Sequence, residues 1–118
     1  MRRDSLYING EWVGANGDGV IEVVNPATEE MIGTVPIGSQ ADIDAAVKAA
    51  RDAFPSWASS SIEERIEVLN QLSAAIKDNT EELAQIITAE VGTPIGYSRM
   101  AMVGTPRVVA RSYAKILE

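Results

Sequence analysis

The chain has 118 residues, 46% of them hydrophobic and 23% charged, a composition typical of a globular domain or of part of one. Its formal net charge of −7 argues against nucleic acid and against an anionic membrane surface as partners. It contains no Cys and no His, which excludes disulfides, a thiolate nucleophile, a Cys-ligated metal and a Ser-His-Asp triad built from this chain alone.

The N-terminal part has the pattern of strands and turns. Asn9-Gly10 lies inside LYINGEWV and predicts a hairpin over residues 7–13, because both residues tolerate the positive φ of a type I′ turn. The glycine-rich stretch at 14–19 indicates a flexible turn. Further strands are expected near 20–24 and 31–35.

The turn between those two strands contains an acidic pair. Pro26 keeps Asn25 out of the helical region and so ends the first of the strands. Glu29 and Glu30 follow on the turn, and we interpret them as solvated charges rather than as a catalytic acid/base pair.

From Ser39 onward the apolar residues recur with the period of an α-helix. Ser39 and Asp42 form a variant of a capping box, and Pro55 is expected to end the helix that they start. The apolar stripe of this first helix comprises Ile43, Val47, Ala50 and Phe54.

The later helices have start and stop signals of their own. Ser61 with Glu64 predicts a second capping box, and Gly92 suits the residue that follows a helix. Thr105-Pro106 indicates the start of a last helix, with an apolar stripe that includes Val109, Tyr113 and Ile116. The expected helices cover about 40–54, 62–78, 80–91 and 106–117.

No motif in the sequence carries catalytic chemistry. Gly14, Gly17 and Gly19 precede a strand, whereas a dinucleotide fingerprint needs a helix after its glycine turn. Trp12 and Trp57 are interpreted as packing residues rather than ligand-stacking surfaces. The pair Arg2-Arg3 is not followed by the apolar run of an export signal, and no run is long enough to span a bilayer, so a cytoplasmic location is expected.

The predicted strands are few for the number of apolar helix faces, since each such face must be buried against a sheet or another helix. The sequence therefore indicates the first part of a larger α/β domain, with residues 1–118 as a single incomplete domain.

Between Leu6 and Gly96 the chain resembles the N-terminal part of the NAD(P)-dependent aldehyde dehydrogenase superfamily. The resemblance weakens after Gly96. It is carried, in order, by YINGEWV, VVNPATEEMIGTVP, ADIDAAVKAARDAFPSWASSSIEERIEVLNQLSAAI and AEVGTPIG.

The resemblance implies an enzyme that binds its dinucleotide on a Rossmann-like domain and attacks the aldehyde with a Cys thiolate. A Glu then activates the water that releases the acid, and an Asn side chain with the Cys backbone amide holds the oxyanion. In the family these residues, and the Pro-Trp-Asn segment and Lys of the cofactor site, lie downstream of this stretch. No catalytic, cofactor-binding or metal-binding residue is therefore assigned to this chain.

Three details of the family pattern bear on single residues. The family often has Gly where Glu29 stands here, which argues against a positive φ at that position. A Lys common in the family is replaced by Thr93. In some relatives a monovalent cation binds at positions corresponding to Val23, Val24 and Glu90, and for Glu90 a surface or capping role is the simpler interpretation.

The resulting hypothesis is an N-terminal fragment of an aldehyde dehydrogenase, the first part of its NAD(P)-binding domain, that is inactive alone and binds no cofactor alone. NAD or NADP is used by the complete enzyme. Two alternatives stay open: a free-standing helical interaction module, and a subunit that pairs with a separately encoded catalytic remainder. The expected partner is the rest of the polypeptide, or further copies that associate through exposed helix faces.

Overall fold

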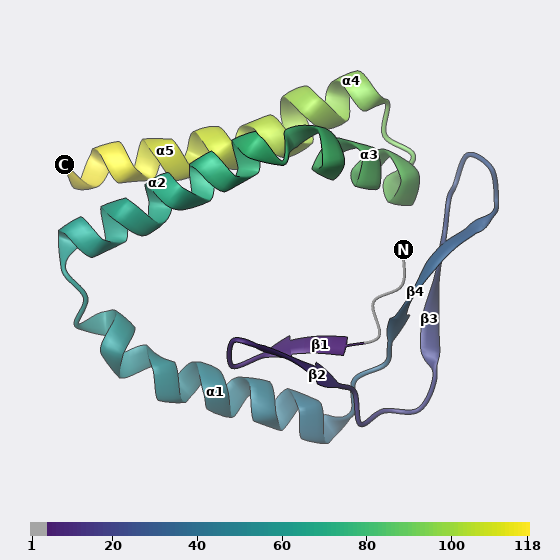
Figure 1. Cartoon of the computed structure of the whole chain (residues 1–118), viewed down its shortest axis with the longest axis horizontal. Coiled ribbons are helices and arrows are strands. Elements are labelled where there is room, and N and C mark those ends of the chain that lie inside the picture. Colours follow the sequence, from purple (N-terminus) through teal and green to yellow (C-terminus); the bar gives the residue numbers. More distant parts are fainter. Residues whose placement is uncertain (1–4) are drawn as a thin grey trace. The chain divides into compact units, whose positions relative to one another are not determined.

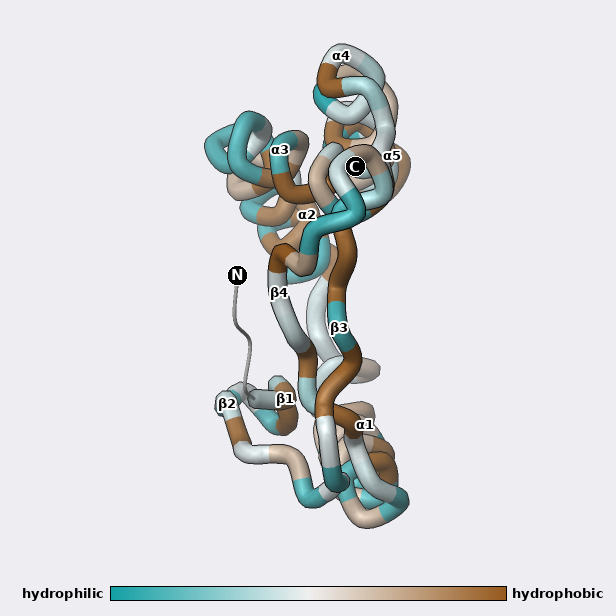
Figure 2. Tube along the Cα trace, turned by 90° about the vertical axis from the view of Figure 1, so that its right-hand side faces the viewer, coloured by the Kyte–Doolittle hydropathy of each residue, from teal (hydrophilic) through white to brown (hydrophobic). Residues whose placement is uncertain are grey.

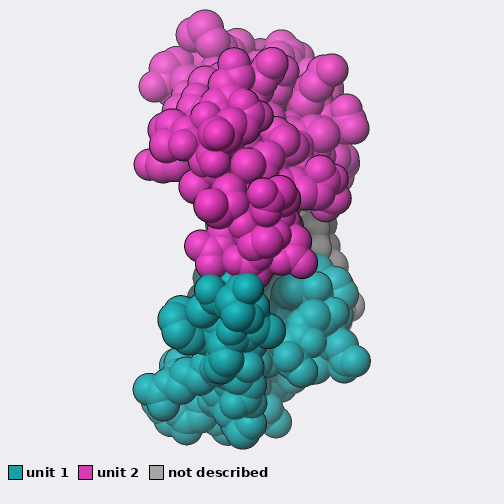
Figure 3. Space-filling view, turned by 90° about the vertical axis from the view of Figure 1, so that its left-hand side faces the viewer, with its two compact units in different colours: residues 1–59 teal, residues 60–118 magenta. Residues whose placement is uncertain are grey.

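A computed structural model describes residues 5–118 of the chain. Arg2 and Arg3, considered above as an export signal, lie outside the described residues. The chain divides into two compact units, Met1–Ser59 and Ser60–Glu118 (Figure 3). Whether both belong to one domain of a larger fold stays a prediction.

The first unit begins with the predicted hairpin. Strands β1 (Ser5–Ile8) and β2 (Glu11–Gly14) pair antiparallel, with Tyr7 opposite Trp12 (Figure 1). Asn9 and Gly10 have φ of 54° and 82°, as the type I′ turn requires. The hairpin expected over residues 7–13 is confirmed.

A second antiparallel pair consists of β3 (Val20–Val24) and β4 (Met31–Pro36). Hydrophobic residues occupy most of β3, interrupted by Glu22 (Figure 2). The register shifts between Val23 and Val24, so the pair contains a β-bulge.

The turn between β3 and β4 corrects one expectation. Glu29 has a φ of 61° despite its side chain, where a positive φ was not expected. Its N–H donates to the Asn25 carbonyl at 2.8 Å, and the Asn25 N–H donates to the Glu30 carbonyl at 2.9 Å. These two bonds fix the turn and outweigh a conformational cost of roughly 1–3 kcal/mol.

Helix α1 (Gln40–Ala58) completes the first unit and is longer than predicted. Its capping box is formed in both directions by Ser39 and Asp42. Pro55 was expected to end the helix but lies inside it. A proline removes only the hydrogen bond of its own N–H, and the final turn is closed by the Ser59 N–H, which donates to the Pro55 carbonyl at 3.2 Å.

The second unit is a helical hairpin. Its first arm consists of α2 (Ile62–Asp78) and α3 (Thr80–Val91), separated at Asn79 as predicted. Ser61 and Glu64 form the predicted capping box. Gly92 follows α3 with φ 74°, the left-handed conformation typical of this position.

The return arm starts earlier than the predicted 106–117. It runs through α4 (Ile95–Tyr97), a π-helical segment η1 (Ser98–Val103) and α5 (Gly104–Leu117). Pro106 suggested a helix start, yet it lies within the first turn of α5, directly after the wider turns of η1. A proline lacks the donor for the α-type hydrogen bond, and a π-type segment just before it accommodates the gap.

Among residues 5–118, the buried hydrophobic side chains are small and lie in the second unit: Ala84, Val103, Ala110 and Ala114. Helix α5 packs against α2 through this small-residue side, and the Ser73 hydroxyl donates to the Arg107 carbonyl at 3.2 Å. The stripe expected for the last helix, Val109, Tyr113 and Ile116, stays exposed instead. Among the described residues, no helix has the length and hydropathy needed to cross a bilayer.

Candidate functional site

The described residues offer little catalytic chemistry. Within residues 5–118, no three side chains of His, Cys, Asp or Glu come together in a group that could hold a metal ion. Every buried side-chain nitrogen or oxygen in that range has a hydrogen-bond partner.

The most buried carboxylate is Asp42, 4% exposed at the start of α1. Its Oδ2 accepts from the N–H and hydroxyl of Ser39 at 2.7 and 2.9 Å and from the Asn16 N–H at 3.0 Å, and its Oδ1 accepts from Asn16 Nδ2 at 2.6 Å. The Ser39 backbone bond, helped by Asn16 and opposed by desolvation, lowers the pKa of Asp42 to about 2. With its oxygens committed in this way, Asp42 fastens the loop at 14–19 to α1 rather than acting as a base.

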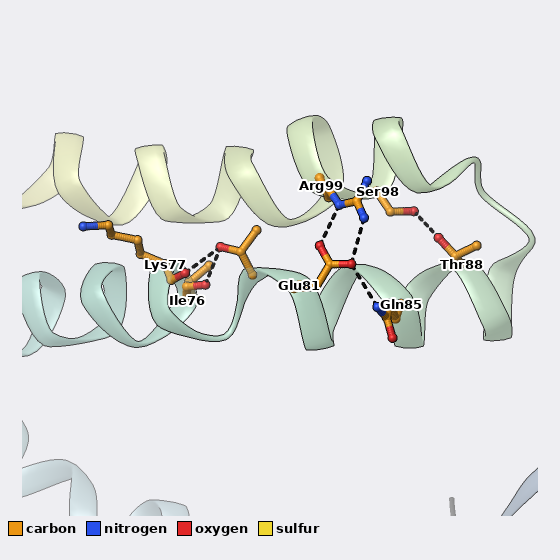
Figure 4. Close-up of polar contacts among 8 residues, drawn as sticks. Ile76, Lys77, Glu81, Gln85, Thr88, Ser98 and Arg99 are labelled. Carbon is orange, nitrogen blue, oxygen red and sulfur yellow. Dashed lines mark hydrogen bonds and ion pairs between the residues drawn. The ribbon is translucent and has the colours of Figure 1, made fainter.

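A second cluster joins the two arms of the helical hairpin (Figure 4). Arg99 of η1 donates through Nε and Nη2 to the two oxygens of Glu81 in α3, both at 2.7 Å, and Gln85 donates to Glu81 at 2.9 Å. The Arg99 hydrogen bonds, followed by the one from Gln85, lower the pKa of Glu81 to about 2. The pKa of Arg99 is raised by the same contact. This cluster ties one helix to another.

The hydroxyl of Ser98 is fully buried next to that ion pair. It lies 2.9 Å from Thr88 Oγ1 (Figure 4). It also donates to the Thr93 carbonyl at 3.3 Å. A nucleophilic serine needs a base within hydrogen-bond reach, and these oxygens are a hydroxyl and a carbonyl. Ser98 therefore connects α3 to the return arm without activating chemistry.

The first unit has a shallow hollow of about 340 Å³ between its hairpin and α1. No side chain on it carries a charge, so it offers nothing to hold a phosphate or a metal. Its lining comprises Tyr7, Ile8, Asn9, Gly10, Ala46, Ala49, Ala50 and Ala53.

The residues that the sequence analysis considered as possible binding residues lie in different units of the chain. Val23 and Val24 lie at the bulge of β3 in the first unit, and Glu90 lies exposed on α3 in the second. Cation binding at these residues stays a prediction. Trp12 packs against Tyr7 with ring centroids 5.1 Å apart, and Trp57 lies half-exposed on α1.

The sequence revealed the Ser39–Asp42 capping box, but neither the link from Asn16 to Asp42 nor the cluster around Glu81. Asn16 lies in a stretch interpreted as a flexible turn, yet it is anchored to Asp42, 26 positions away in the chain. Glu81 and Arg99 are 18 positions apart, with nothing local to connect them. Both clusters hold elements together, and neither presents a free reactive group.

Comparison with known proteins supplies the context that these residues lack. The family model described as "Aldehyde dehydrogenase family" matches residues 12–118. A curated relative, the 3-succinoylsemialdehyde-pyridine dehydrogenase of a Pseudomonas species, is 42% identical over 90 residues, which cover 76% of this chain and 19% of the relative.

Solved structures agree over almost the whole chain. A mutant of aldehyde dehydrogenase C from Pseudomonas syringae, solved with NAD+ and octanal, is 39% identical with a TM-score of 0.94, covering 98% of this chain and 24% of that one. An aldehyde dehydrogenase from Bartonella henselae is 28% identical, also with a TM-score of 0.94, over 99% of this chain and 25% of its own. The chain thus spans about a fifth to a quarter of the proteins it matches.

Proposed function

The chain belongs to the aldehyde dehydrogenase family, and on that premise we propose that it is the N-terminal segment of an NAD(P)-dependent enzyme that oxidises aldehydes to carboxylic acids. The observation that carries the proposal is the agreement with the Pseudomonas syringae enzyme, 39% identical with a TM-score of 0.94 over 98% of the chain. Similarity of both sequence and backbone over that span supports a shared role in the complete protein.

The dinucleotide is assigned to the complete enzyme because this segment does not fit it. A Rossmann-type site needs a parallel strand pair with a helix starting at the glycine turn. The two sheets of the described residues are antiparallel pairs, and the glycines at 14–19 lead into a strand. We therefore propose that the chain alone binds neither NAD nor NADP and oxidises no aldehyde. We also propose that the complete enzyme works in the cytoplasm.

A chimera tests the proposal. This chain would replace the matching quarter of the Pseudomonas syringae enzyme, and the reduction of NAD+ in the presence of octanal would be followed by absorbance. We expect turnover by the chimera, and none by the 118-residue chain or by the recipient enzyme without its matching segment. A folded but inactive chimera would refute the proposed role. Turnover by the purified chain alone would show that it has chemistry of its own.

A further inference from the structure

Helix α5 has two exposed flanks of opposite character on either side of its buried positions. Ala110 and Ala114 face α2 and are buried. Val109 and Tyr113 each precede one of these alanines, and they are 44% and 59% exposed. Arg111 and Lys115 each follow one of them. At about 100° per residue, the preceding and following residues lie on opposite flanks.

Helix α2 repeats the arrangement. Ser73 and Leu69 lie on the side toward α5, buried and partly buried. Leu72 and Val68 precede them and are 49% and 46% exposed, whereas Ala74 and Asn70 follow them. The flank of preceding residues is again apolar.

The two helices run antiparallel and side by side (Figure 1). In an antiparallel pair, the flanks of preceding residues fall on the same side of the pair, and so do the flanks of following residues. One side of the hairpin is therefore mostly apolar, with Arg65 near the start of α2. The other side carries Glu67, Asn70, Arg111 and Lys115 together with the exposed Val108. We define the apolar face by six exposed residues: Val68, Leu72, Val109, Tyr113, Ile116 and Met102, the last of which precedes the buried Val103 in η1.

We infer that this apolar face is the docking surface for the remainder of an aldehyde dehydrogenase polypeptide, an inference that rests on the proposed function. In two solved relatives the same backbone, at a TM-score of 0.94, is only 24–25% of the chain, so there it is built into a body about four times larger. Most charged groups lie on the opposite side, which suits it to water, whereas the apolar face is bordered on α2 by Arg65, whose Nε donates to the Ser60 hydroxyl. A contiguous apolar surface of this kind marks an interaction site.

Single cysteines test the inference, because the natural chain has none. Tyr113→Cys places a thiol on the apolar face, and Arg111→Cys is the matched control on the opposite flank of the same helix. Each is made in the free chain and in the chimera with the Pseudomonas syringae remainder, and the alkylation rate at that position is measured by mass spectrometry at submicromolar protein. We expect alkylation of Tyr113→Cys to be at least tenfold slower in the chimera than in the free chain, with Arg111→Cys unchanged.

The outcomes separate this inference from the proposed function. An active chimera in which Tyr113→Cys reacts as fast as in the free chain overturns the docking surface and leaves the proposed function intact. Protection of Tyr113→Cys in a free chain of defined dimer mass would assign the face to a second copy and overturn the inference as well. If the chimera does not fold, the free chain is labelled in the presence of the separately produced remainder, and equal rates with and without it refute the inference.

Discussion

Gly17 lies where two backbone segments of the first unit come close together. A Cβ on Gly17 would overlap the carbonyl oxygen of Ile37 and would lie 3.0 and 3.1 Å from the carbonyl carbons of Ile37 and Gly38. The neighbouring Asn16 is bonded to Asp42. The loop at 14–19 is thus held against the segment that leads into α1, although its glycines alone indicated only flexibility. A contact between distant backbone segments has no signature in local composition.

We predict that Gly17→Ala destabilises the chain by about 1–3 kcal/mol, because the added methyl group overpacks a contact with rigid backbone. For a chain of this size, thermal unfolding followed by circular dichroism should shift downward by roughly 4–8 °C per kcal/mol. Gly14→Ala is the matched control, since its Cβ would meet nothing within 4 Å. Equal midpoints for the two variants would contradict the prediction.

The starts of α1 and α2 and the full extents of α2 and α3 could be predicted from sequence, whereas the end of α1 and the start of the return arm could not. The capping boxes of Ser39 and Ser61 are local, and the structure contains both. Pro55 was expected at the end of a helix and Pro106 at the start of one. Pro55 lies inside α1, and Pro106 lies in the first turn of α5, which directly continues η1. The return arm from 95 to 103 was missed because its π-helical turns follow no 3.6-residue period.

We predict that the Glu81–Arg99 pair, which joins α3 to η1, makes the stability of the chain depend on pH in the acidic range. The pKa of Glu81 falls from about 4.5 to about 2 on folding, so its stabilising contribution is complete above roughly pH 4.5 and is lost as the pH falls toward 2. Both side chains are about half exposed, so solvent screening keeps the effect to a few degrees in the unfolding midpoint.

The measurement is the unfolding midpoint between pH 7 and 3 for the natural chain and for Glu81→Gln. The variant should start lower at pH 7 and lose less stability on acidification. Asp42 has a pKa lowered in the same direction, so part of the acid sensitivity should persist in Glu81→Gln. An identical pH profile for the two proteins would exclude a role for the pair.

The chain as a whole exposes more surface than its mass predicts. Its accessible surface is 8470 Å² for 12.6 kDa, whereas a compact protein of that mass exposes about 6,200 Å², and two separate compact bodies of half the mass about 7,500 Å² together. The sequence indicated this outcome, since it contains more apolar helix faces than its strands can cover. The sequence did not indicate which face of α5 is exposed. The small residues Ala110 and Ala114 pack against α2, and only the structure shows this contact.

We predict that the isolated 118-residue chain is marginally stable and associates through its exposed apolar side chains. A fully buried aliphatic or aromatic side chain contributes roughly 1.5–3 kcal/mol. The six residues of the apolar face are 37–74% exposed, so on average each forgoes about half of that contribution. Their sum is comparable to the ~5–15 kcal/mol that stabilises a typical domain. Light scattering should show a mass that rises with concentration, hydrophobic dye should bind, and denaturant unfolding should be broad. Val109→Glu should reduce dye binding, whereas Arg111→Glu should not. A monodisperse monomer with a sharp transition and no dye binding would contradict the prediction, and would favour a free-standing module over a segment of a larger enzyme.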